Sequence, residues 1–263
     1  MKIEVNIKDN KMLSKFINYL FGGVDSNDDK RDDLGDRMNR YTQSCQLYTE
    51  YFTPFIVSIQ SKDILDGINT VTNLDEKIKQ MKTINDLLYQ VCKSVYNRFD
   101  PTLVYYFNNE IHVLFNGNSE LLYNGDIYKL ITILTSFVTK EFQGNCMFTA
   151  KYTEFPKDYE CLNYLVWRQF DCKRNNVTLL YKCLHKDLYL DSALGCDQKL
   201  DDMFAELPEL PLFLTLGNIL KKNLVYHEKK GVVYHRKLIE VMHINLAENF
   251  SQNFKTLVCN KIK

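Results

Sequence analysis

The sequence predicts an α+β protein built around a ferredoxin-like βαββαβ sheet, with flanking helices and C-terminal additions. Three observations predict this fold. Apolar, β-branched segments of strand length recur at residues 53–60, 102–107, 110–115 and 146–155. Two longer segments, 74–99 and 126–142, carry apolar residues at helical spacing. Their order along the chain is strand, helix, hairpin, helix, strand, which is the split βαβ arrangement.

Local signals place the boundaries of these elements. The first strand reads TPFIVSIQ and is followed by the polar sequence Ser-Lys-Asp. The long helix ends at Asp100-Pro101, because proline disfavours a helical conformation in the residue before it. Asn108-Asn109 joins the two middle strands, and asparagine tolerates the positive φ of a tight hairpin. A further helix is predicted over residues 34–49.

The composition is that of a globular protein with a substantial core. Hydrophobic residues make up 45% of the 263 residues, which excludes a disordered chain. The 33 basic and 33 acidic residues cancel, which argues against a small basic nucleic-acid binder. However, residues 221–263 carry nine Lys or Arg and three Asp or Glu, a local charge of +6. The neutral total can therefore conceal a basic face.

Other classes of protein are disfavoured. Residues 1–10 lack the apolar core of a signal peptide, and no apolar segment is long enough to span a membrane. The eight cysteines form no C-x-x-C pair, and the five histidines show no close ligand spacing, so a zinc site is not expected. We expect reduced thiols and a cytoplasmic location.

Residues 164–176 form the most specific motif. They read YLVWRQFDCKRNN and match Y-L-x-W-R-Q-x-D-x-x-x-N, the signature of the tRNAHis guanylyltransferase superfamily, which the chain therefore resembles. Residues 33–41, DLGDRMNRY, are similar to the D-L-G-D-R-M-K-x-Y opening of guanylyltransferase-like proteins. FTAK at 148–151 lies where the family has F-D-x-R, and GCDQKLDDM at 195–203 is a weaker match. The resemblance spans about residues 33 to 203.

The resemblance implies a palm-like fold and the addition of a nucleotide to a tRNA 5′ end, in the 3′-to-5′ direction. The family activates that end with a nucleoside triphosphate, GTP or ATP, before the 3′-hydroxyl of an incoming nucleotide attacks it. Two Mg²⁺ ions lower the pKa of the hydroxyl and neutralise the phosphates. The family commonly forms tetramers, so a homotetramer or a dimer is expected. Its tRNAHis-specific members often carry H-I-N-N where residues 173–176 read KRNN, so tRNAHis specificity is not implied.

The resemblance divides the chain into three regions. Residues 1–32 are an N-terminal extension that leads into an acidic loop at 25–36. Residues 33–206 are a palm-like nucleotidyltransferase domain, and residues 207–263 are a basic C-terminal extension. In that extension a β-hairpin is expected, with lysines at its turn over residues 227–231. These lysines are either solvated or in contact with tRNA phosphates.

Both metal-ligand positions of the family are replaced in this chain. Gln60 stands for the Asp of the family's R-x-D-G-R strand end, and Asn109 stands for the Asp of its S-D-E hairpin. Mg²⁺ prefers anionic oxygen, and amides bring no charge. Asp63 could substitute only if its loop bends back, and Glu110 is expected on the opposite face of the strand from Asn109. The replacements predict weak or absent catalysis, and no residue is assigned as catalytic or metal-binding.

Other positions of the family's site are kept in part. The resemblance assigns nucleotide contacts to Lys62, Lys129 and Lys151. It assigns tRNA or nucleotide contacts to the signature residues Trp167, Arg168, Gln169, Asp171 and Asn175. Without the resemblance, Trp167 is more readily explained as a core residue than as a base-stacking platform. Likewise, Arg168 and Asp171 could form an ordinary ion pair on a helix surface.

Three hypotheses remain open at this stage. The first is a guanylyltransferase-like protein that binds a tRNA 5′ end and a nucleoside triphosphate, with Mg²⁺ if it is active. The second is a pseudoenzyme that binds tRNA or nucleotide without reacting it. The third is an interaction protein without either ligand, which only the acidic segment at 25–36 supports.

Overall fold

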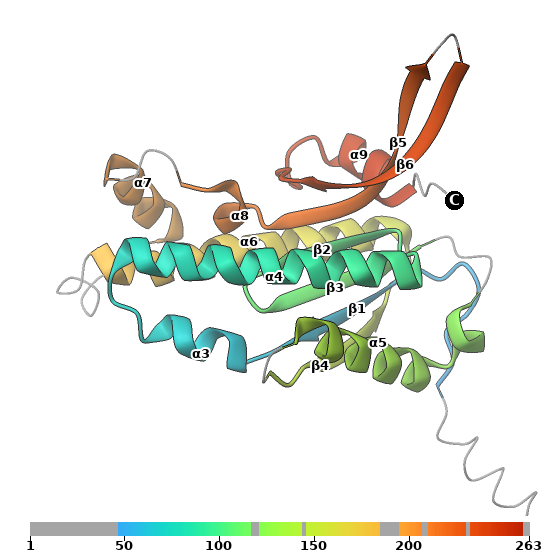
Figure 1. The fold of residues 1–263 in the computed structure, drawn as a ribbon, viewed down its shortest axis with the longest axis horizontal. Helices are drawn as coiled ribbons and strands as arrows, with labels where there is room; N and C mark the ends of the chain where they lie inside the picture. The colour runs from blue at the N-terminus through green and yellow to red at the C-terminus, as the bar shows by residue number, and fades with distance from the viewer. Residues whose placement is uncertain are drawn as a thin grey trace, which may run out of the picture. The chain divides into compact units, whose positions relative to one another are not determined.

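The predicted strands form one antiparallel sheet in the computed structural model (Figure 1). The structure describes residues 47–116, 121–143, 146–184, 195–206, 210–229 and 232–259. The acidic loop, the motif at 33–41 and nearly all of the helix predicted over 34–49 lie outside these residues. The last three residues of that predicted helix, 47–49, are not helical, and Tyr48 forms an isolated β-bridge with Asp126.

The strand order confirms the ferredoxin-like prediction. The first four strands are β1 (Phe55–Gln60), β2 (Leu103–Phe107), β3 (Glu110–Phe115) and β4 (Thr149–Glu154). In the described part of the chain the sheet order is β4-β1-β3-β2-β5-β6, and every neighbouring pair is antiparallel. β1 lies between β3 and β4, so its side chains face either of the two surfaces of the sheet in alternation.

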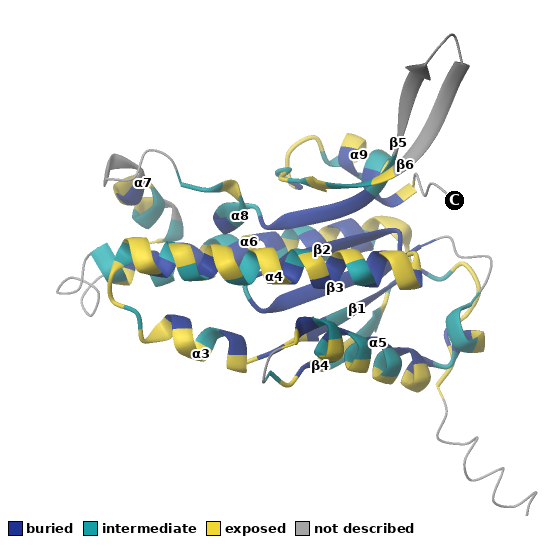
Figure 2. Ribbon diagram, in the orientation of Figure 1, coloured by how far each residue is buried: buried dark blue, intermediate teal, exposed yellow. Residues whose placement is uncertain are grey.

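Two helices, α4 (Leu74–Phe99) and α5 (Ile127–Phe142), cover one face of the sheet (Figure 1). Asn73 caps α4 by accepting a hydrogen bond from the Glu76 amide, and Asp126 caps α5 by accepting one from the Lys129 amide. The strands present an almost wholly apolar surface to these helices, and the strand residues of this face are buried: Phe55, Val57, Ile59, Ile111, Val113 and Phe115. This layer is the main core (Figure 2).

The opposite face of the sheet packs against α6 (Asp158–Leu184) and C-terminal segments. Leu162, Leu165 and Cys172 on α6 join Ile56 and Leu114 of the sheet in a second buried cluster. The short C-terminal helices α9 (Phe250–Asn253) and η2 (Phe254–Cys259), the latter of π type, complete this layer. The same strands therefore have an apolar layer on each side.

Smaller elements were not expected from the sequence. η1 (Leu122–Gly125) leads into α5, and α3 (Asp63–Asn69) follows β1 directly. Ile68 of α3 packs in a third cluster with Met81, Val177, Leu180 and Met203. That cluster also includes parts of α7 (Cys196–Glu206) and α8 (Leu212–Thr215). α3 escapes a periodicity search because it has only seven residues.

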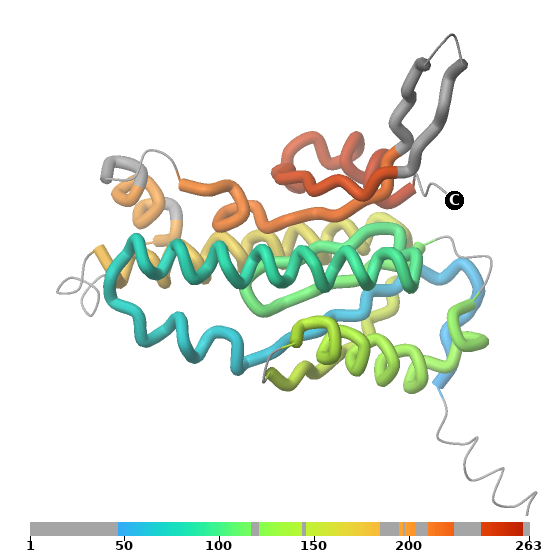
Figure 3. The backbone as a smooth tube through the Cα atoms, viewed as in Figure 1, coloured from blue at the N-terminus to red at the C-terminus, as the bar shows by residue number. Residues whose placement is uncertain are grey.

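The C-terminal hairpin is present and extends the main sheet. β5 (Asn218–Lys229) pairs with β6 (Val232–Met242), and its first residues pair with β2. The part of the hairpin that lies next to the main sheet can be followed in colour in Figure 3. Residues 230–231 of the expected turn lie outside the described part of the chain. Among the described helices, none is both long and apolar enough to cross a membrane.

Candidate functional site

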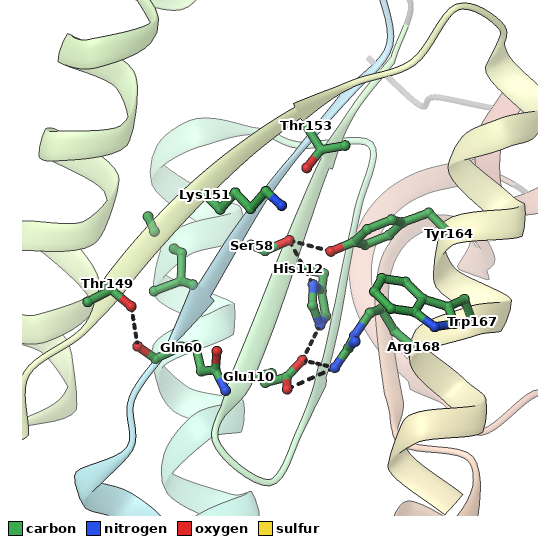
Figure 4. A pocket seen from close by; sticks show the side chains of 12 residues that line it. Ser58, Gln60, Glu110, His112, Thr149, Lys151, Thr153, Tyr164, Trp167 and Arg168 are labelled. Carbon is green, nitrogen blue, oxygen red and sulfur yellow. Dashed lines mark hydrogen bonds and ion pairs between the residues drawn. The ribbon is translucent and has the colours of Figure 1, made fainter.

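A pocket of about 300 Å³ lies on the α6 face of the sheet (Figure 4). β1, β3 and β4 form its floor and α6 one wall. Its polar lining comes from strand positions two residues apart, because such residues share a face: Ser58 with Gln60, and Glu110 with His112. In the β1–β3 ladder, Ser58 is directly opposite His112 and Gln60 is opposite Glu110. Four polar side chains of β1 and β3 are thus gathered at one place, beside the polar residues that β4 adds to the pocket: Thr149, Lys151 and Thr153.

A continuous chain of hydrogen bonds crosses this pocket (Figure 4). The Tyr164 hydroxyl lies 2.7 Å from Ser58 Oγ, and Ser58 Oγ lies 3.1 Å from His112 Nδ1. His112 Nε2 lies 3.0 Å from Glu110 Oε2. Arg168 Nη2 donates to both Glu110 oxygens, at 2.6 and 2.9 Å. These hydrogen bonds therefore connect α6 to β1 through Tyr164 and to β3 through Arg168.

The hydrogen-bond partners of His112 and Glu110 indicate which of their atoms carry protons. Burial lowers the pKa of His112 below its usual 6.5, so the ring is neutral at pH 7. A neutral ring that faces the Glu110 carboxylate donates through Nε2 and accepts from Ser58 through Nδ1. Burial alone would raise the pKa of Glu110, but hydrogen bonds from His112 and the Arg168 charge outweigh it and lower that pKa below 4.5. Glu110 is therefore an anion at pH 7.

Arg168 belongs to a buried ionic network. Its Nη1 donates to Asp171 Oδ2 at 2.6 Å, and Asp171 also forms an ion pair with Arg174. The Arg168, Glu110 and Asp171 side chains are only 11–12% exposed. The alternative of an ion pair between Arg168 and Asp171 is realised, but the pair is buried and not on the helix surface, and Glu110 of β3 reaches the same guanidinium. Two carboxylates and two guanidinium groups balance in charge.

Trp167 is exposed, and its prediction as a core residue was wrong. Its side chain is 55% exposed at the pocket wall, because the buried stripe of α6 passes through Leu165, Gln169 and Cys172 instead. The Arg168 guanidinium lies over the indole at 4.6 Å from the ring centroid. Tyr164 meets the same ring edge-on, with centroids 5.5 Å apart. The helical position was predicted correctly, but the side on which it faces was not.

Gln169 and Asn175 take different positions from their signature neighbours. Gln169 is buried, and its amide nitrogen donates to the carbonyls of Leu216 and Ile244 at 2.7 and 2.9 Å. Its amide oxygen accepts from the Leu246 backbone at 2.8 Å. Asn175 is exposed, whereas the next residue, Asn176, is buried and donates to the Leu214 carbonyl. Gln169 therefore joins α6 to the C-terminal segments.

Gln60 and Asn109 lie at the end of β1 and in the β2–β3 turn, as the sequence predicts. Gln60 is exposed and borders the pocket. Asn109 is buried, and its amide nitrogen donates to the Ser61 carbonyl at 2.5 Å. The Asp63 carboxylate accepts a hydrogen bond from the Met147 amide at 2.8 Å, and Asp63 is not among the described residues that border the pocket.

These residues do not fit two Mg²⁺ ions. Among the residues that the structure describes, Glu110 is the one carboxylate that borders the pocket, and Arg168 and His112 already bind it. The expectation that Glu110 is a poor substitute ligand thus gains a further reason, the occupied carboxylate. Within the described ranges, no group of three or more His, Cys, Asp or Glu side chains could hold a metal ion. Divalent cations would meet neutral amides here.

The three lysines expected at a nucleotide are not brought together. Lys151 of β4 borders the pocket (Figure 4). Lys62 immediately precedes α3, beyond the end of β1. Lys129 is in the first turn of α5, a helix that packs on the other face of the sheet. One pocket can therefore use Lys151 but not Lys129.

Sequence reasoning missed Ser58, His112 and Tyr164 as site residues. A signal for two of them exists in the strands, which read FIVSIQ and EIHVLF. Polar residues two positions apart within an apolar strand indicate a polar patch on one face. The partner across the strands could not be read, because it depends on the β1–β3 register.

The comparisons with known proteins agree with this fold. No family model matches the chain. An uncharacterised protein of Acanthamoeba polyphaga mimivirus is 24% identical over 234 residues, which cover 73% of this chain and 78% of that protein.

Three solved structures are similar over almost their whole lengths. A bacterial tRNA(His) guanylyltransferase-like protein in complex with GTP gives a TM-score of 0.66 at 19% identity, and covers 85% of this chain and 98% of that chain. A bacterial protein of this kind in complex with ATP gives 0.63 at 19% identity, with 86% and 99% covered. The Saccharomyces cerevisiae tRNA(His) guanylyltransferase gives 0.58 at 14%, with 81% and 98% covered.

The class that these similarities define is a palm-like α+β fold. More particularly, it is the fold of the tRNAHis guanylyltransferase-like proteins, as the sequence resemblance implies.

Proposed function

We propose that this chain belongs to the tRNAHis guanylyltransferase superfamily and binds a nucleoside triphosphate and a tRNA 5′ end without catalysing the two-metal transfer. The shared fold and the W-R-Q-x-D motif support the family, since Trp167 and Arg168 of that motif border the pocket. The GTP and ATP found in the bacterial relatives support a nucleotide ligand.

The chemistry of Gln60 and Asn109 is the observation that carries the loss of transfer. The family's reaction needs anionic oxygens at these two places to hold Mg²⁺. Here the Gln60 amide borders the pocket and can contact solvent or ligand. The Asn109 amide donates to the Ser61 carbonyl, which orients its nitrogen toward the protein. Glu110 adds no charge for a metal because Arg168 neutralises it.

The remaining groups suit binding. Lys151 supplies a positive charge at the pocket, and its position on β4 places it across the ladder from Ser58. The exposed Gln60 amide and Thr149 hydroxyl can hydrogen-bond to a ribose or a base edge. Arg168 is held by two carboxylates, so it shapes the wall of the pocket and is not available as a mobile phosphate ligand.

A transfer assay tests the proposal directly. The protein is incubated with 5′-monophosphorylated tRNA, labelled GTP or ATP, and Mg²⁺, and incorporation into tRNA is measured. We expect none above background, together with nucleotide binding that has equal affinity in Mg²⁺ and in EDTA. Incorporation that persists through purification and is lost in Lys151→Ala, but not in the matched Lys129→Ala on the other face, would show that the enzyme is active.

Restoring the carboxylates gives a second test. Gln60→Asp combined with Asn109→Asp should introduce Mn²⁺ binding, measured by calorimetry, and a detectable transfer rate. Asn109→Asp alone loses the hydrogen bond to Ser61 and places an anion near its carbonyl, so we expect a stability loss of about 1–3 kcal/mol. Added Mn²⁺ should reverse part of this loss in the double variant.

Retained 3′-to-5′ addition is the second candidate function. One observation favours it: the Glu110 side chain lies directly across the ladder from Gln60, so a carboxylate does border the pocket. If Glu110→Gln abolished a transfer activity that Gln60→Ala left intact, the reaction would depend on this carboxylate.

A further inference from the structure

The exposed aromatic surface of α6 is not explained by the packing of the fold. Trp167 and Phe170 are 55% and 58% exposed and lie three residues apart, so they are neighbours on one side of the helix. Arg174, whose side chain is 65% exposed, follows on the same side one turn later. Single exposed apolar residues are common, but two adjacent aromatics beside a polar pocket and a basic residue form a defined surface.

The indole of Trp167 is held in a fixed orientation. Arg168 covers part of it at 4.6 Å, and that guanidinium is itself bound by Glu110 and Asp171. Tyr164, which supports the indole edge-on, is fixed by its hydrogen bond to Ser58. The ring is therefore pre-organised before any ligand arrives, and stacking on it costs little conformational entropy.

We propose that Trp167 is a stacking platform for an unpaired base at the end of an RNA chain. Bases stack on exposed aromatic rings whatever their identity, and nearby cations bind the phosphates. Trp167 lies at the wall of a pocket that Lys151 also borders, and Arg174 lies on the same side of α6. The pocket of about 300 Å³ is at the lower end of the range for small-ligand sites, a size that suits a single nucleoside.

The basic residues decide between RNA and other occupants. A second copy of this chain would need an acidic or apolar partner surface over Trp167. Lys151, which borders the same pocket as Trp167, and the exposed Arg174, which lies on the same side of α6, instead favour a partner that carries phosphates. This inference rests on the proposed function because it takes RNA as the ligand. It adds that a base of the RNA stacks on Trp167, and the tests below separate RNA binding from this stacking contact.

Trp167 is the chain's only tryptophan, so its fluorescence reports on this site alone. The full-length protein is titrated with an RNA hairpin that carries unpaired terminal nucleotides, with a blunt hairpin of the same stem, and with free GTP. We expect saturable quenching by the first RNA and much weaker quenching by the blunt one. Strong quenching by GTP with none by either hairpin would overturn the RNA assignment.

Binding of the labelled hairpin to variants completes the test. Trp167→Ala should weaken affinity roughly ten-fold or more, whereas Trp167→Phe should keep most of it, because the aromatic face remains. Tyr128→Ala is the matched control, since Tyr128 is 50% exposed on α5, across the sheet. Circular dichroism checks that each variant is folded.

The outcomes distinguish the two proposals. Salt-dependent RNA binding that is unchanged by Trp167→Ala would overturn the platform and leave the proposed RNA binding intact. No RNA binding at all would overturn both. Loss of self-association in Trp167→Ala, measured by sedimentation with unchanged RNA affinity, would overturn the platform and assign this surface to a second copy of the chain.

Discussion

The two faces of the central sheet differ in chemistry, although the same strands build both and each face contributes to an apolar cluster. On the α4–α5 face, residues such as Val57, Ile59 and Val113 are fully buried among apolar side chains. On the α6 face, the alternate positions of β1 and β3 carry Ser58, His112 and Glu110. The first face is stabilised by the burial of apolar surface area, and this hydrophobic stabilisation is non-directional. The second depends on hydrogen bonds that must all be made together.

This difference predicts different responses to substitution. A substitution on the apolar face should lower the stability of the protein in proportion to the side-chain volume removed, whichever residues surround the site. A buried polar chain loses most when one member is removed and its partners stay charged and unpaired. The comparison can therefore be tested by substitutions on each side.

The largest effect is expected on the apolar face. Phe115 is 1% exposed and stacks on Phe55, with ring centroids 5.0 Å apart. Phe115→Ala should lower the free energy of unfolding by about 3–5 kcal/mol, because it leaves a cavity in the main core. Urea denaturation measures the change. A loss below about 1 kcal/mol would mean that this face is loosely packed.

A slightly smaller effect is expected from Arg168→Met on the polar face. Glu110 would keep only its His112 partner, and Asp171 only Arg174, so we expect a loss of about 3 kcal/mol. Adding Glu110→Gln should recover part of it, because the buried negative charge is removed. If the double variant were as unstable as the sum of both single variants, the two residues would not be energetically coupled.

The pH dependence of stability tests His112. Its folded pKa is lowered below 6.5, so the unfolded chain takes up a proton more readily, and stability falls as the pH drops below 6.5. Glu110 acts at lower pH: its stabilising contribution is present above 4.5 and is lost as the pH falls through its lowered folded pKa. Urea midpoints above and below 6.5 should differ more for the wild type than for His112→Gln. Equal differences would show that His112 is not the titrating group.

The smallest effect is expected from Trp167→Ala, despite the size of the residue removed. Because the ring is 55% exposed, its removal should cost less than about 1 kcal/mol of stability. Thermal unfolding measures this, and a drop as large as that of Phe115→Ala would place the indole in the core instead.

Local patterns predicted the fold better than they predicted the site. The four strands and two long helices of the βαββαβ unit follow from periodicity and from stops such as Asp100-Pro101, and the structure confirms their order. These signals act over neighbouring residues. By contrast, Glu110 and Arg168 are 58 residues apart, and their contact depends on how α6 crosses the sheet. No spacing within the sequence encodes that placement.

The error at Trp167 has the same origin. Residue type alone does not show which side of α6 is buried, because this helix also buries polar residues: Gln169, Asp171 and Asn176. A hydrophobicity pattern ranks the indole above these three for burial. The structure reverses the order because each of these three side chains forms at least one hydrogen bond.

Through Gln169, the C-terminal region takes part in holding α6 in place. One amide group satisfies backbone atoms of residues 216, 244 and 246, which belong to segments on either side of the β5–β6 hairpin. Shortening the chain before Asn218 would remove two of the three hydrogen-bond partners of that buried amide and leave β2 as an open sheet edge. The helix that carries the pocket's aromatic wall would lose its support at the same time. The C-terminal segments therefore support the helix that lines the pocket, although none of their described residues borders it.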